Sequence, residues 1–190
     1  IMHIPTKEII KASLVKLLNE CPMNEITVKM VCQDAGISRQ ALYNHYYCLP
    51  DVLEEVLVDE MERAVENLGT YKTWASGFEA ILNNLLRNKT LLLHVYNSDN
   101  RNELLRIIEN FGSSLVKKGI SDCAADMGYN VTEQDRMFML RLYMFTFMGL
   151  IDQWMKKGMK MEPGYIASRC EAMIGFSIRG TLKKLYGTET

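Results

Sequence analysis

Residues 39–45 of this 190-residue chain combine side chains that can read base edges with side chains that can hold a phosphate backbone. Arg39 can donate two hydrogen bonds to O6 and N7 of guanine, and Gln40 can pair in the same bidentate way with adenine. Tyr43 and His45 suit contacts with phosphate, and Asn44 suits either role. The chemistry that this cluster indicates is recognition of double-stranded DNA.

These side chains need a helix that holds them on one exposed face, and the neighbouring residues predict that helix. Thr27 can cap a first helix, Gly36 can supply the left-handed residue that ends it, and Ser38 can cap a second helix over residues 39–46. This pattern is typical of a helix-turn-helix whose second helix enters the major groove, although a simple helical hairpin with a solvated polar face has the same pattern. The residues that we expect to contact DNA are Thr27, Lys29, Ser38, Arg39, Gln40, Tyr43, Asn44 and His45.

Over residues 6–57 the sequence resembles the TetR family of bacterial transcriptional regulators. Tyr46 replaces the phenylalanine that is common at the end of the recognition helix, and Leu49 stands where the family usually has a phosphate-binding lysine. The resemblance implies a homodimer that binds operator DNA. The segments that carry it, in the family's order and spacing, are Thr27-Val28-Lys29, Ala35-Gly36-Ile37-Ser38, Leu42-Tyr43-Asn44-His45-Tyr46 and Asp51-Val52-Leu53.

The composition is that of an ordinary globular protein, with 48% hydrophobic and 24% charged residues. The net charge of -1 predicts a modest electrostatic contribution to DNA binding, which a dimer would double. The five cysteines show no Cys-x-x-Cys spacing, so we expect no metal, no cofactor and a reducing cytoplasm. Lys7 and Lys11 interrupt any N-terminal apolar segment, and the apolar run at 137–151 is too short to cross a bilayer. We therefore expect neither a signal peptide nor a membrane span.

Helical periodicity continues to the end of the chain, so the expected fold class is all-α. We expect a helix-turn-helix DNA-binding domain at residues 1–49 and an effector-binding and dimerisation domain at 50–190, with a helix at 50–68 connecting the two. We expect Thr6 to cap a first helix that Pro22 ends, with an inward apolar stripe of Ile10, Leu14, Leu17 and Leu18. Further helices are predicted over residues 50–68, 74–88, 90–96, 101–125, 133–157 and 165–186.

The last two of these helices have features of a subunit interface. Residues 137–155 of the helix at 133–157 are apolar nearly all round, so this stretch must be covered on several sides at once. The helix at 165–186 carries small residues such as Gly175 and Gly180, which permit close helix approach. The resemblance implies that the two helices pair with their copies in a dimer, and the alternative is a self-sufficient monomer core. Gly149, Trp154, Gly158 and Pro163 resemble the subgroup of dihydroxyacetone-kinase operon activators.

Two modes of regulation stay open. The first is a repressor that a small-molecule effector releases, since methionines can line an adaptable apolar cavity, although they can equally fill a core. The second, implied by the subgroup, is a regulator or activator controlled by a protein co-regulator such as a kinase-like subunit. We expect no enzyme activity, because the chain has no nucleophile-base pair, phosphate loop or paired carboxylates. The methionines considered are Met137, Met139, Met144, Met148, Met155, Met159, Met161 and Met173.

Three further expectations concern regulation. Arg141 and Asp152 are the polar groups that we expect to orient a ligand or a partner. An effector would change the separation of the two recognition helices, which must be about 34–36 Å, or a multiple, to enter successive major grooves. The residues expected to influence this coupling are Val65, Leu68, Trp74 and Phe78.

Overall fold

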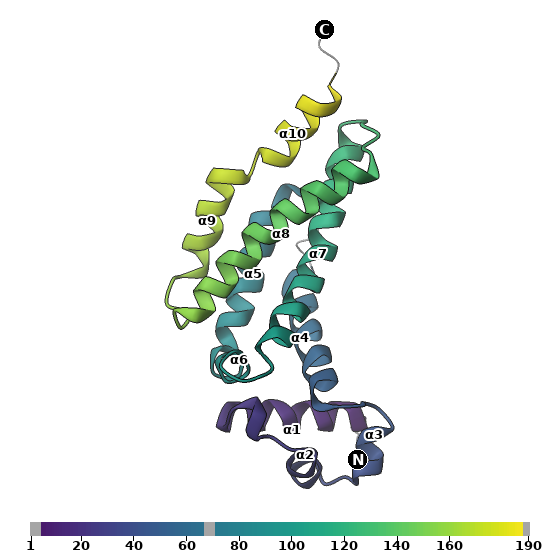
Figure 1. The fold of residues 1–190 in the computed structure, drawn as a ribbon, viewed down its shortest axis with the longest axis vertical. Helices are drawn as coiled ribbons and strands as arrows, with labels where there is room; N and C mark the ends of the chain where they lie inside the picture. Colours follow the sequence, from purple (N-terminus) through teal and green to yellow (C-terminus); the bar gives the residue numbers. More distant parts are fainter. Residues whose placement is uncertain (1–4, 67–70, 188–190) are drawn as a thin grey trace. The chain divides into compact units, whose positions relative to one another are not determined.

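The computed structural model describes residues 5–66 and 71–187, and this part of the chain is built from helices without strands (Figure 1). The predicted all-α fold class is confirmed. Contacts divide the chain into a first unit, residues 1–61 with 87–107, and a second unit, residues 62–86 with 108–190. In the described residues no helix is both long enough and apolar enough to cross a membrane.

The first unit is organised around α1, which packs against α2 and α6. Ile10, Leu14 and Leu18 lie on one face of α1 and are fully buried, as the sequence stripe predicts. His94 in α6 contacts the backbone carbonyl of Leu18 through Nδ1 at 2.7 Å. The helices of this unit are α1 (Thr6–Glu20), the short 3-10 helix η1 (Met23–Glu25), α2 (Val28–Ala35), α3 (Arg39–Tyr43), most of α4 (Leu49–Val65), α6 (Lys89–Tyr96) and the start of α7 (Arg101–Asp126).

The second unit is a bundle in which long helices surround an apolar interior. One part of its core joins Ile120 and Cys123 of α7 to Met139 of α8 and Leu182 of α10. The helices of this unit are the end of α4, η2 (Tyr71–Thr73), α5 (Trp74–Arg87), the greater part of α7, α8 (Glu133–Lys156), α9 (Pro163–Ile174) and α10 (Ser177–Tyr186).

The prediction of a single helix at residues 165–186 is wrong, because this segment forms two helices, α9 and α10 (Figure 1). A Cβ added at Gly175 would lie 2.4 Å from the backbone oxygen of Glu171, so this turn needs glycine. Ser177 Oγ donates a 2.6 Å hydrogen bond to the carbonyl of Ile174 and so satisfies a backbone acceptor at the break. Propensity alone did not reveal the break, since Gly175 keeps helical dihedral angles.

Several helix ends also differ from the predictions by one to three residues, including the following two in the first unit. Pro5 occupies the N-cap of α1 and Thr6 is its first residue, so the predicted Thr6 cap is wrong. The helix α3 ends at Tyr43 rather than near Tyr46. The predicted end of the connecting helix at Leu68 and Gly69 lies outside the described residues.

Candidate nucleic-acid interface and internal cavity

The turn between α2 and α3 is held by three local features that fix the direction of α3. Thr27 Oγ1 accepts a hydrogen bond from the N–H of Met30 at 3.3 Å and caps α2. Gly36 ends α2 in the left-handed region, with φ 66° and ψ 32°. Ser38 Oγ then accepts from the N–H of Ala41 at 3.1 Å and caps α3. Each side chain that the sequence assigned to this turn performs its predicted backbone role.

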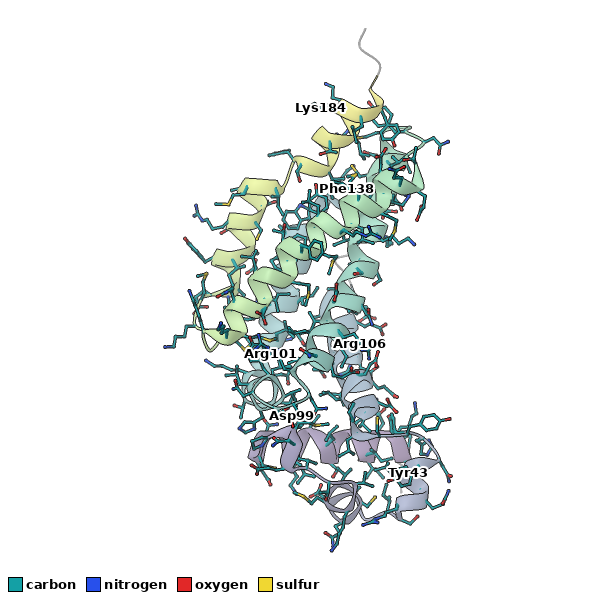
Figure 2. The ribbon with its side chains drawn as sticks, in the orientation of Figure 1. Tyr43, Asp99, Arg101, Arg106, Phe138 and Lys184 are labelled. Atoms are coloured by element: carbon teal, nitrogen blue, oxygen red, sulfur yellow. The ribbon has the colours of Figure 1, made fainter. Side chains whose placement is uncertain are left out.

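The helix α3 divides sharply into a buried side and an exposed side. Leu42 is fully buried, and Tyr46 just beyond the helix is 5% exposed. Gln40 Nε2 donates a 3.1 Å hydrogen bond to Asn44 Oδ1, so these two amides are aligned one helical turn apart. All eight predicted contact residues lie at the surface, and Tyr43 is labelled in Figure 2. They are Thr27, Lys29, Ser38, Arg39, Gln40, Tyr43, Asn44 and His45.

The start of α4 is less suited to phosphate than in the family pattern. Leu49, in the place of the family's lysine, is 7% exposed and packs into the core. The Asp51 carboxylate accepts hydrogen bonds from the backbone N–H groups of Tyr47 at 3.1 Å and Cys48 at 3.2 Å. Those donors at a helix start could otherwise bind an anion. This role of Asp51 is not among the sequence-based predictions, although an acidic residue in the first turn of a helix is a signal for it.

An ionic cluster in the first unit joins α1 to α4 behind α3. Lys11 is 8% exposed, and its Nζ lies 2.7 Å from carboxylate oxygens of both Glu8 and Asp59. Burial works to lower the pKa of Lys11, but the hydrogen bonds to these carboxylates outweigh it and raise the pKa. Lys7 Nζ pairs with Glu55 at 2.8 Å and lies 5.2 Å from the ring centre of Tyr46. The cluster therefore holds the aromatic residue that closes the recognition region.

A cavity of about 180 Å³ lies in the second unit. Phe147 contributes to its wall and packs with Trp74 and Phe78, at ring-centre distances of 5.8 and 4.8 Å. The lining comes from the last turn of α4 and from α5, α7, α8 and the break between α9 and α10. The lining residues are Val65, Trp74, Gly77, Phe78, Ile81, Ile108, Phe111, Gly112, Leu115, Val116, Lys118, Gly119, Asp122, Tyr143, Met144, Phe147, Met148, Ile151, Ile174, Gly175 and Ile178.

The lining differs in part from the residues that the sequence suggested. Of the eight methionines considered, Met144 and Met148 line the cavity. Met139, Met155 and Met159 are core residues, Met137 is half-buried, and Met161 and Met173 are exposed. Arg141 is exposed and Asp152 is half-buried, and neither lines the cavity. Val65, Trp74 and Phe78, which were expected to influence coupling, do line it.

The hydroxyl and the charged side chains of the lining have partners within the protein. Tyr143 Oη and Ser177 Oγ lie 2.6 Å apart, and Ser177 in turn donates to Ile174. Burial raises the pKa of Tyr143, so its hydroxyl stays protonated. Lys118 and Asp122 pair at 2.9 Å with side chains that are 62% and 43% exposed. The arrangement is that of an apolar pocket with one buried hydroxyl.

Large apolar side chains are exposed on the side of α8 that does not line the cavity, on α9, and at the break between α9 and α10. We call these side chains together the apolar stripe. Phe145 is 76% exposed and Phe176 is 86% exposed. Phe138 is marked on Figure 2. Large apolar side chains exposed in this number indicate a surface that a partner covers. The apolar stripe comprises Phe138, Leu142, Phe145, Leu150, Tyr165, Met173 and Phe176.

The comparison with protein families decides the identity. The family model TetR_C_8, described as a transcriptional regulator C-terminal region, matches residues 72–175, which is more than half of the chain. The chain belongs to the TetR family of transcriptional regulators. The predicted family resemblance is thus confirmed, and the match covers most of the residues that line the cavity or form the apolar stripe of this TetR regulator. A search of curated protein sequences found no significant match.

Solved structures of low sequence identity share the fold of this TetR regulator. The dihydroxyacetone kinase operon activator DhaS is 17% identical with a TM-score of 0.69, over 97% of this chain and 100% of DhaS. The TetR family repressor AlkX from Dietzia sp. strain DQ12-45-1b, implicated in biodegradation of n-alkanes, is 16% identical with a TM-score of 0.53, over 92% and 95%. GusR of Salmonella enterica is 15% identical with a TM-score of 0.54, over 97% and 96%.

Proposed function

We propose that this TetR regulator is a homodimeric repressor that binds operator DNA through α3 and leaves it when a small molecule enters the cavity. The observation that carries the DNA proposal is the exposed polar face of α3, held in place by the Thr27 and Ser38 caps and the left-handed Gly36. Arg39 has no ion-pair partner among the described residues, so its guanidinium is available to a base.

The contact residues divide into two roles. Arg39 and Gln40 read bases, whereas Thr27, Lys29, Tyr43 and His45 hold the phosphate backbone. Ser38 belongs with the backbone contacts, because its oxygen caps Ala41 and its proton can still be donated to a phosphate. Asn44 can serve either role. Its Oδ1 accepts from Gln40, which leaves its amide N–H groups to be donated to a base or to a phosphate.

The homodimer proposal is supported by the apolar stripe. Met173 and Phe176 of the α9 region are 79% and 86% exposed, which a stable monomer in water would not favour. A second copy related by a two-fold axis would cover the same surface on both subunits. Permanent interfaces of this kind bury more than about 2,000 Å² in total.

The effector proposal is supported by the position of the cavity. On α8, Phe147 and Met148 line the cavity, while Phe145 and Leu150 belong to the apolar stripe, so one helix separates the two. Val65 in the last turn of α4 also lines the cavity. A ligand that prefers one position of these helices would change the spacing of the recognition helices in the dimer. A cavity of this kind favours a small molecule over a protein co-regulator, which remains the alternative.

The test is selection of binding sites from random double-stranded DNA with the full chain. We expect an inverted repeat, and Arg39→Ala should lower affinity for it by roughly 5- to 150-fold and relax preference at one base pair per half-site. Arg87→Ala is the matched control, because Arg87 is an exposed arginine at the end of α5 and is not a proposed contact. No enrichment with the wild-type chain, or an unchanged preference in Arg39→Ala, would overturn the proposal.

A further inference from the structure

We propose that the cavity takes a small, uncharged, mainly apolar molecule about the size of a substituted benzene ring, with one hydrogen-bond donor that reaches the Tyr143 hydroxyl. This inference deepens the proposed function and rests on the cavity being the effector site. It is carried by the volume of the cavity, the pairing of its charges and the hydrogen bonds of Tyr143, the lining residue that carries a hydroxyl.

The volume sets the size of the ligand. At about 180 Å³, the cavity is slightly larger than an apolar protein cavity of roughly 150 Å³ that stays dry and binds benzene. The aromatic group of Trp74, Phe78 and Phe147 on one wall suits packing against a ring. A single ring with a short substituent therefore matches this volume, and the apolar wall does not suit a sugar-like compound.

The charges of the lining exclude ions. Among the described residues that line the cavity, the charged ones are Lys118 and Asp122, which pair with each other at 2.9 Å and are well exposed to solvent. A carboxylate or an ammonium group in the interior would thus lose its water without gaining an opposite charge. Burial of an unpaired ion is strongly unfavourable, so an uncharged ligand is preferred.

The hydrogen bonds of Tyr143 favour a ligand that donates a hydrogen bond to its hydroxyl oxygen. A hydroxyl has one proton, and Ser177 uses its proton on the carbonyl of Ile174 at 2.6 Å. The 2.6 Å contact between Tyr143 and Ser177 must therefore use the proton of Tyr143. The Tyr143 oxygen keeps a lone pair that can accept, so an alcohol, phenol or N–H group can bind without breaking this chain. A ketone has no proton to donate, so it could bind Tyr143 only by taking the place of Ser177 as the acceptor of the Tyr143 proton.

The test compares matched ring compounds by calorimetry with the full chain at pH 7. The probes are benzyl alcohol, toluene, benzoate and benzylammonium. Benzyl alcohol should bind tightest, toluene about 3- to 10-fold weaker for want of one hydrogen bond, and both ions at least about 100-fold weaker. Tyr143→Phe should bring benzyl alcohol to the level of toluene and leave toluene unchanged.

A second pair of variants locates the site. Met148→Trp adds bulk at a half-buried lining position and should abolish binding of benzyl alcohol. Met161→Trp makes the same exchange at an exposed position outside the lining and should bind as the wild type does. Equal binding of Met148→Trp and the wild type would place the probe elsewhere and overturn the inference.

The remaining outcomes separate this inference from the proposed function. Benzoate or benzylammonium binding as tightly as benzyl alcohol would overturn the ligand class, as would an undiminished preference for benzyl alcohol in Tyr143→Phe. Binding in the expected order with no effect on affinity for the selected DNA would support the ligand class and contradict the effector role. Failure of the wild-type chain to bind DNA would contradict the proposed function but would not change the conclusion drawn from the calorimetry.

Discussion

Replacing Phe145 by alanine should dissociate the proposed dimer, because this side chain lies in the apolar stripe on α8 and is 76% exposed in the single chain. A phenylalanine covers about 150–250 Å² when fully buried, so an interface would remove roughly 150 Å² of Phe145 from water. At about 25 cal/mol per Å² this is close to 4 kcal/mol for each side chain.

The measured loss of dimer stability should be smaller than this for each Phe145 side chain, but both subunits carry the substitution. Alanine keeps its Cβ and water can refill part of the space, so about 2–3 kcal/mol for each copy is realistic. A two-fold interface contains the substitution twice, which gives about 4–6 kcal/mol. The dimer dissociation constant should therefore rise by roughly 10³- to 10⁴-fold.

Sedimentation velocity over a wide range of concentration measures this directly. The wild-type chain should be a dimer at micromolar concentration and Phe145→Ala a folded monomer, with helix content checked by circular dichroism. Tyr47→Ala is the control, since Tyr47 is 95% exposed but lies outside the apolar stripe. A wild-type monomer, or a Phe145→Ala dissociation constant within about threefold of the wild-type value, would refute the proposed interface.

Three further predictions concern the break, the α4 start and the ionic cluster. Gly175→Ala should lower the free energy of unfolding by about 1–3 kcal/mol in urea titrations, because its Cβ would meet a backbone oxygen at 2.4 Å. Gly180→Ala is the control, since a Cβ there meets nothing within 4 Å and should not destabilise the fold. Equal effects of the two substitutions would contradict this prediction. Asp51→Asn keeps the hydrogen-bond acceptor and removes a charge near phosphate, so DNA affinity should rise about two- to fivefold at low salt, alike for all sequences, and no rise would place that carboxylate away from DNA. Burial works to raise the pKa of Glu55, but its favourable contacts, led by the hydrogen bond to Lys7, together outweigh burial and lower the net pKa. The stabilisation is complete above the unfolded pKa of about 4.3 and is lost as pH falls through the folded value. Denaturation from pH 7 to 3 should thus show a smaller loss of stability in Glu55→Gln, and an identical pH profile would contradict it.

The local parts of this structure could be predicted from the sequence, since their causes are local. Thr27 and Ser38 accept from the backbone three residues ahead, and Gly36 takes the left-handed conformation that its turn requires. The inward side of α3 followed from helical spacing, and Leu42 is indeed buried.

The break after α9 and the composition of the cavity could not be predicted in this way. Gly175 has helical dihedral angles, so whether the helix continues depends on contacts with other helices. Between residues 137 and 155 α8 is apolar nearly all round, so periodicity did not separate Met148, which lines the cavity, from Met155 in the core. The cavity wall draws on helices that are far apart in the sequence, and their arrangement becomes visible only in three dimensions.

The central claim is that α3 reads bases through Arg39 in both subunits of a dimer. Protection of guanine N7 from methylation by dimethyl sulfate, measured on the selected DNA site, tests it most directly. We predict protected guanines in two symmetric half-sites whose centres lie about 10 base pairs, or a multiple, apart. In Arg39→Ala this protection should disappear. An unsymmetric single site, or protection that persists in Arg39→Ala, would contradict the claim.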